Sequence, residues 1–114
     1  MVALVRGNAT LPDQRGWDPH AGRIDGPGLD DVDAVVNLTG SPIAGGRWTA
    51  ERKAEILNSR TAPARAIAAA LTPGGRCQRF LSGSATGYYG STGPEIVDEE
   101  SPAGTGFLAG VVAE

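Results

Sequence analysis

The segment that most constrains the fold is residues 34–42, AVVNLTGSP, together with the long run of residues 50–71 behind it. A short apolar run that ends in a small polar loop and then opens a helix is the strand-loop-helix half of an α/β unit. In open α/β sheets, ligands bind at the carboxyl ends of the strands. The sequence therefore predicts an α/β domain in which the loop after residue 38 borders a binding site.

The helix behind this loop is predicted to start at Thr49, whose hydroxyl suits a helix N-cap. Apolar residues then recur at roughly helical spacing, as expected for a helix that lies on a sheet; they are Ile56, Leu57, Ala64, Ile67, Ala68 and Leu71. Pro63 has no amide hydrogen to bond back to Ser59, so it predicts a kink or a break there. Residues 72–75, TPGG, are expected to end the helix.

Other elements are expected on both sides of this unit. Residues 1–5 are apolar without alternation, which suits a parallel strand buried on both faces. Residues 9–28 are rich in Gly, Pro and Asp and predict a loop with one short strand near residues 22–25. A single helical turn is expected at residues 27–33. A strand that begins at Phe80 runs into a Gly-rich loop through residue 90, and residues 107–114 suit a short helix.

Composition excludes several classes of protein. A chain of 114 residues, 40% hydrophobic and 20% charged, is typical of one small globular domain. A net charge of -3 without a basic stripe argues against nucleic-acid binding. Cys77 is the only cysteine and His20 the only histidine, so an internal disulfide and a Cys/His zinc site are both excluded, and no metal is expected.

The apolar runs are shorter than the roughly 20 residues of a membrane helix, and the first residues lack the features of a signal peptide. These two observations favour a cytoplasmic protein without a membrane partner.

Several short motifs fall in an order that resembles a known family. They are Arg6 after a strand, Trp17-Asp18-Pro19, Gly22, Ile24-Asp25, residues 37–40 (NLTG), residues 42–45 (PIAG), Arg47-Trp48, Ser59-Arg60 and residues 84–90 (SATGYYG). In this order they resemble the atypical branch of the extended short-chain dehydrogenase/reductase superfamily, the nucleoside-diphosphate-sugar epimerase-like proteins of the NAD-dependent epimerase/dehydratase family. The resemblance extends from Met1 to Glu114.

This resemblance implies an α/β fold with a partial Rossmann-like parallel sheet. Residues 1–114 would form the middle part of a longer NAD(P)-binding domain, without its first strand, the glycine fingerprint of that strand, or the C-terminal substrate lobe. In the family's strand order the missing strand would lie between the strand at Met1 and the strand at Ala34. Two strand edges would then have to pair directly, recruit another chain or stay exposed. We therefore expect the chain to fold poorly or to self-associate, which size-exclusion chromatography tests.

The resemblance also implies NADP(H) as cofactor, with NADP favoured over NAD. It places Val5 and Arg6 where the family reads the adenosine 2′-phosphate, and a guanidinium has the charge and fork geometry for that group. The alternative for Arg6 is a solvated charge at a strand end. Leu38, Thr39 and Gly40 would let backbone amides approach the adenosine and ribose, or would be an ordinary strand end.

Three further residues are assigned to the cofactor site by resemblance. Glu55 would accept from a ribose hydroxyl or the adenine amine, Arg60 would reach the phosphates, and Ser82 would lie at the end of its strand beside the cofactor. The alternative for Glu55 is a solvated helix face. Ser41 and Arg47 are candidates for the substrate site, although Gly45-Gly46 fits a mobile connecting loop equally well.

The catalytic candidate is Ser84, which matches the Ser/Thr that hydrogen-bonds the reacting carbonyl or hydroxyl in this superfamily. Its alternative is a loop serine that satisfies backbone groups. The Tyr-x-x-x-Lys pair of the superfamily would fall where this chain has Phe107, which cannot transfer a proton. Tyr88 and Tyr89 are not followed by a lysine four positions later.

The function implied is an NADP(H)-binding oxidoreductase or epimerase-like protein for a sugar nucleotide or a similar small molecule, here as an inactive or incomplete fragment. The alternatives are a non-catalytic NADP-binding regulatory or interaction protein of the cell-division-associated type, and an inert fragment. The genomic sequence upstream of Met1 would separate the last from the others if it encodes a strand with a Gly-x-x-Gly-x-x-Gly turn.

Overall fold

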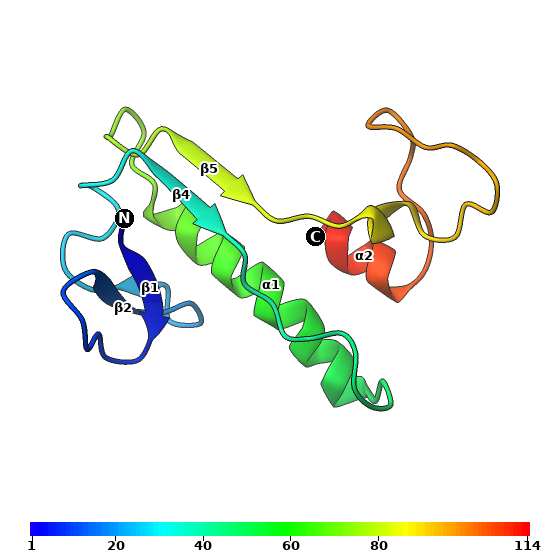
Figure 1. Cartoon of the computed structure of the whole chain (residues 1–114), viewed down its shortest axis with the longest axis horizontal. Coiled ribbons are helices and arrows are strands. Elements are labelled where there is room, and N and C mark those ends of the chain that lie inside the picture. The colour runs from blue at the N-terminus through cyan, green and yellow to red at the C-terminus, as the bar shows by residue number, and fades with distance from the viewer. The chain divides into compact units, whose positions relative to one another are not determined.

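The computed structural model describes residues 1–114, which divide into two compact units, Met1–Ser82 and Gly83–Glu114. The first unit contains β1 (Ala3–Arg6), β2 (Gln14–Asp18), β3 (Arg23–Ile24), β4 (Ala34–Asn37), α1 (Ala50–Ala70) and β5 (Arg79–Ser82) (Figure 1). The second unit contains the 3₁₀ helix η1 (Thr86–Tyr89) and α2 (Phe107–Ala113). Neither α-helix combines the length and the apolar character that a membrane crossing requires.

The strands of the first unit form two separate sheets. One sheet has the order β1-β2-β3, with β1 parallel and β3 antiparallel to β2. The other consists of β4 and β5, which run parallel with Ala34 opposite Arg79 and Asn37 opposite Ser82. β1 and β4 are both edge strands and do not pair with each other. The gap that was expected between these two strands is therefore present.

Between residues 9 and 33 the structure differs from the sequence-based expectation in two places, at β2 and at residues 27–33. β2 occupies residues that were expected to be loop, whereas the expected short strand is found as β3. Gln14, Arg15 and Gly16 give no apolar alternation, so β2 has no signal of its own and depends on pairing with β1 and on the buried side chain of Trp17. Residues 27–33 form turns rather than a helical turn, with the Asp30 amide bonded to the Pro27 carbonyl at 3.1 Å.

β1 is parallel as predicted, but the expectation that it is buried on both faces is wrong. Leu4 and Val5 are half-buried, and Met1 and Val2 before the strand are exposed. Of the residues of β1, Leu4 packs against the buried cluster of the first unit.

α1 is one continuous helix, so of the two alternatives predicted at Pro63, a kink or a break, the break is wrong. Thr49 is the N-cap as predicted, and its hydroxyl accepts a hydrogen bond from the Arg52 amide at 3.2 Å. Pro63 is among the most deeply buried side chains of the chain, so tertiary packing holds the helix across the lost backbone bond. The helix ends at Ala70, just before residues 72–75, as predicted.

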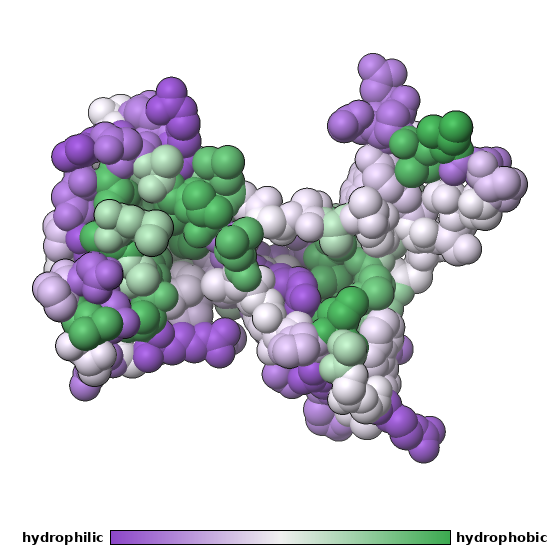
Figure 2. All heavy atoms as spheres, viewed as in Figure 1, coloured by the Kyte–Doolittle hydropathy of each residue, from purple (hydrophilic) through white to green (hydrophobic).

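The core of the first unit lies between the strands and α1. Its buried members are Trp17, Leu29, Ala66, Ile67 and Cys77. Val35 of β4 and Phe80 of β5 pack against this cluster, whereas the neighbouring Val36 and Leu81 are 61% and 54% exposed. The β4–β5 sheet is therefore covered by α1 on one face and bare on the other, and apolar surface gathers on the first unit in the view of Figure 2.

Candidate functional site

The candidate site of the first unit lies where β1 and β4 end. The two strands run in the same general direction, so that Arg6 and Asn37 lie at corresponding ends (Figure 1). The loop of residues 38–49 leaves β4 and leads to the start of α1. This loop carries four of the predicted site residues, Leu38, Thr39, Gly40 and Ser41, together with Arg47.

Asn37 organises the start of the loop. Its side-chain oxygen accepts from the Thr39 amide at 3.2 Å and from the Thr39 hydroxyl at 2.7 Å, and its side-chain nitrogen donates to the Ser82 hydroxyl at 3.1 Å. Asn37 is 5% exposed, so these bonds replace water at a buried amide. Two predicted residues, Thr39 and Ser82, are thereby joined through a residue that sequence reasoning had not assigned. The available signal was an amide residue at the end of an otherwise apolar strand.

A second group of bonds ties the loop to α1. The Ser41 amide donates to the buried Ser59 hydroxyl at 2.9 Å, and the Arg60 guanidinium donates to the Ser41 carbonyl at 3.1 Å. Arg60 also donates to the Ile56 carbonyl at 3.0 Å. In this structure Arg60 therefore holds the loop, and its predicted contact with phosphates stays a prediction.

Gly40 lies directly against this guanidinium. A Cβ atom added at Gly40 would lie 2.9 Å from Cζ of Arg60, well inside contact distance. Glycine at this position thus permits the close approach of the loop backbone to α1.

Glu55 is bonded to the same loop from the first turns of α1. It accepts from the Ser41 hydroxyl at 2.8 Å and from the Arg52 guanidinium at 2.7 Å. Arg52 also donates to the Pro42 carbonyl. The Ser41 hydroxyl, followed by the Arg52 guanidinium, lowers the pKa of Glu55 below its ordinary value. Glu55 is thus held at the loop by hydrogen bonds, while its side chain remains 54% exposed on the helix face.

This arrangement predicts an acid-sensitive loop. Because the folded-state pKa of Glu55 is lowered, its contribution to loop order is fully present above its unfolded pKa and is lost as pH falls through the folded value. Exchange of the Ser41 amide with solvent, followed by NMR, is expected to accelerate relative to the intrinsic rate as pH falls through the lowered, folded-state pKa of Glu55. In the E55Q variant this acid step should be missing; an identical step in the variant would show that Glu55 does not control the loop.

The remaining cationic candidates differ in their surroundings. Arg6, the last residue of β1, is exposed and forms no ion pair or side-chain hydrogen bond in the structure, and Val5 before it is half-buried. Arg47 is exposed in the loop. Next to it, the indole of Trp48 donates to the Ile43 carbonyl at 3.1 Å, which ties the tip of the loop together. Arg6 is therefore an unengaged guanidinium at the end of a strand.

Ser84 belongs to the second unit and is exposed in the segment before η1. Within that unit, Tyr88 and Tyr89 stand edge to face with ring centroids 5.2 Å apart. α2 begins at Phe107 as predicted. No group of three or more His, Cys, Asp or Glu side chains is arranged to hold a metal ion.

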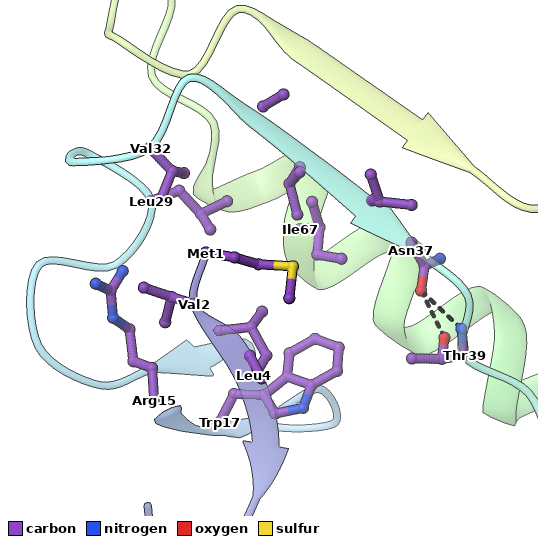
Figure 3. Close-up of a pocket in the computed structure, with 14 residues that line it drawn as sticks. Met1, Val2, Leu4, Arg15, Trp17, Leu29, Val32, Asn37, Thr39 and Ile67 are labelled. Atoms are coloured by element: carbon purple, nitrogen blue, oxygen red, sulfur yellow. Dashed lines mark hydrogen bonds between the residues drawn. The ribbon is translucent and has the colours of Figure 1, made fainter. Parts of the chain in front are cut away.

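A cavity of about 320 Å³ opens between β1 and β4 (Figure 3). Met1–Leu4 line one side, Ala34–Asn37 and Thr39 line another, and Trp17 and Ile67 contribute from the core. The Asn37–Thr39 pair lies at its edge, where Figure 3 shows the two bonds to the Asn37 oxygen. The cavity between the two sheets is thus bordered by Thr39, one of the predicted site residues after β4.

Sequence comparison shows what the chain is related to. No protein-family model matches it. It is 38% identical over 109 residues to an epimerase family protein of Mycobacterium leprae and 40% identical over 109 residues to one of Mycobacterium bovis, in each case over 96% of the chain. The chain is a homologue of the epimerase family proteins. A chloroplastic epimerase family protein of Arabidopsis thaliana is 38% identical over 84 residues.

Solved structures agree with this homology. The human epimerase family protein SDR39U1, isoform 2, crystallised with NADPH, matches 98% of the chain with a TM-score of 0.80 and 26% identity. A nucleoside-diphosphate sugar epimerase of Corynebacterium glutamicum matches 98% of the chain with a TM-score of 0.75 and 34% identity. The predicted resemblance and the Rossmann-like α/β fold class are therefore confirmed.

The 114-residue chain spans only part of the length of these proteins. It spans about a third of the mycobacterial relatives, 35% and 36% of their lengths, and 37% and 23% of the two solved chains.

Proposed function

We propose that residues 1–114 form the adenosine side of an NADP(H) site in an epimerase-like oxidoreductase that acts on a sugar nucleotide or a similar small molecule. The observation that carries this proposal is the likeness to a human relative crystallised with NADPH, at a TM-score of 0.80 over 98% of the chain. The nicotinamide cofactor would supply hydride transfer; residues 1–114 would bind and orient its adenosine half.

The structure offers groups that fit this part of the cofactor. Arg6 presents a guanidinium without a competing partner, as a 2′-phosphate monoester requires. The loop after β4 is held in place by Asn37 and Ser59, and Gly40 leaves its backbone uncovered by a side chain of its own. An ordered loop loses less conformational entropy when an adenosine binds to it. Thr39 and Gly40 would contact the ribose and adenine, with Arg6 on the phosphate.

Turnover would depend on groups outside this cluster. Ser84 would orient the reacting carbonyl or hydroxyl of the substrate, and Ser41 and Arg47 would contact the rest of it. By the resemblance, Phe107, the first residue of α2, would take the place of the superfamily's phenol, which favours the second candidate, a non-catalytic NADP-binding regulatory or interaction protein. Hydride-transfer assays with sugar nucleotides, on a protein that contains residues 1–114 and has the full length of the relatives, would distinguish an enzyme from a non-catalytic NADP-binding protein.

The cofactor proposal predicts discrimination by Arg6. Adenosine 2′,5′-bisphosphate should bind the chain about tenfold more tightly than adenosine 5′-monophosphate, because a charge-assisted phosphate contact contributes roughly 1.5 kcal/mol. Arg6→Ala should remove this preference while leaving adenosine 5′-monophosphate binding unchanged, as measured by NMR titration.

Arg23→Ala is the matched control, since it removes an exposed guanidinium from the same sheet. Equal loss of preference in both variants would point to general electrostatic attraction and would overturn the role given to Arg6.

A further inference from the structure

Gly16 lies in the middle of β2, although glycine weakens a strand and often marks the close approach of another segment of backbone. It is buried, and it lies opposite Val5 of β1. The neighbouring side chain of Trp17 belongs to the buried cluster, and side chains alternate across a strand. The position that a side chain of residue 16 would take is therefore on the other face of the sheet.

Two other segments occupy that position. A Cβ atom added at Gly16 would lie 2.5 Å from the carbonyl oxygen of Gly7, the residue after β1. It would also lie 2.5 Å from Oδ2 of Asp25, the residue after β3. The Asp25 amide donates to the Gly16 carbonyl at 2.9 Å. Both strands that pair with β2 thus end against Gly16.

The two contacts differ in how far they can yield to a side chain. The Asp25 carboxylate is the end of a rotatable side chain and is 48% exposed, so it can turn aside. The Gly7 carbonyl belongs to the backbone of the turn that ends β1, where Gly7 has a φ of 82°. Since C···O contacts measure about 3.3 Å or more, a methyl group at Gly16 would displace this carbonyl by at least roughly 0.8 Å. The turn after β1 therefore depends on the missing side chain at Gly16.

Arg6 is joined directly to this turn. It is the last residue of β1, and the chain turns away immediately after the arrowhead of that strand in Figure 1. Its guanidinium makes no ion pair or side-chain hydrogen bond, so the backbone of Arg6 sets the point from which the side chain starts. A forked contact between a guanidinium and a phosphate requires defined geometry. A displaced turn would thus present Arg6 differently to an adenosine 2′-phosphate.

We propose that Gly16 is a positioning residue for cofactor discrimination. By leaving room for the Gly7 carbonyl, it sets the direction in which the chain leaves β1 and hence the place of the Arg6 guanidinium. Gly16 does not touch the cofactor and acts through Gly7 on Arg6. This inference rests on the proposed NADP(H) site.

The first test is the Gly16→Ala variant. NMR titration gives the preference for adenosine 2′,5′-bisphosphate over adenosine 5′-monophosphate as a ratio of Kd values, and thermal unfolding reports whether the variant is folded. The ratio is expected to fall from about tenfold to about threefold or less, because hydrogen bonds to the phosphate weaken steeply with misalignment. Gly87→Ala is the matched control, since no atom lies within 4 Å of its Cβ position, and it should keep the ratio of the parent.

The second test is the Gly7→Ala variant, which alters the same turn without placing an atom against β2. No atom lies within 4 Å of a Cβ at Gly7, but its φ of 82° disfavours alanine. The ratio is expected to fall as in the Gly16 variant. If Gly16→Ala does not fold, Gly7→Ala decides the matter.

A folded Gly16→Ala chain that keeps the tenfold preference would overturn the role of Gly16, and so would a Gly7→Ala chain that keeps it. A parent chain without any preference would instead contradict the proposed NADP(H) site, and the inference about Gly16 would fall with it.

Discussion

Replacing Ile67 with alanine is expected to destabilise the first unit by about 3 kcal/mol. Ile67 is 2% exposed and lies in the buried cluster, where α1 meets the strands. It also forms part of the wall of the cavity, so its removal enlarges an existing void. Truncation of a buried isoleucine typically costs about 3 kcal/mol, from lost burial and from the cavity left behind. A small unit whose two sheets remain unjoined has little stability with which to absorb that loss.

The measurement is thermal unfolding followed by circular dichroism. In a domain of this size a loss of about 3 kcal/mol lowers Tm by roughly 12–24 °C. Ile96→Ala is the matched control, because the same atoms are removed from a side chain that is 99% exposed. A Tm of the Ile67 variant within two or three degrees of the parent would show that the core does not depend on α1 in the manner described.

Replacing Asn37 with alanine is expected to release the loop after β4 and to destabilise the first unit by about 2 kcal/mol. The substitution removes the acceptor of the Thr39 amide and hydroxyl and the donor to the Ser82 hydroxyl. Part-buried partners left without a hydrogen bond account for most of the cost. The Ser41–Ser59 bond remains, so the loop should loosen near Thr39 before it loosens near Ser41.

Chemical denaturation gives the free energy, and amide exchange at Thr39 and Ser41 gives the order of loosening. Asn8→Ala is the control, since Asn8 is an exposed asparagine that follows β1. If both variants lose the same stability, the bonds of Asn37 are not what orders the loop. In the proposed cofactor site, the Asn37 variant should also bind adenosine 2′,5′-bisphosphate more weakly, with its preference over adenosine 5′-monophosphate retained.

Much of the architecture was predictable because its signals are local. The β-branched run of β4, the capping hydroxyl of Thr49 and the start of α2 at Phe107 were all found where the sequence predicts them. β2 was not predictable, because a polar strand is specified by its partner rather than by its own residues. The break at Pro63 was wrong for a related reason: burial of the proline ring outweighs the lost backbone bond.

Some residues of the candidate site could likewise be predicted from the sequence, and others could not. Thr39, Gly40, Ser41, Glu55, Arg60 and Ser82 were predicted as site residues and are connected in the structure by short chains of hydrogen bonds and contacts. Asn37 and Ser59, which make those connections, were not assigned a role, because a hydrogen bond across 18 or 45 positions leaves no pattern in the sequence. The roles of the site residues toward a cofactor stay predictions.

The likeness to epimerase family proteins and the α/β class could be predicted from the sequence, because they depend on the order of short motifs and on apolar periodicity. The division into two sheets, the bare face of the β4–β5 sheet and the cavity between β1 and β4 could be seen only in the tertiary structure. The physical reason is that strand pairing is satisfied between segments far apart in the sequence.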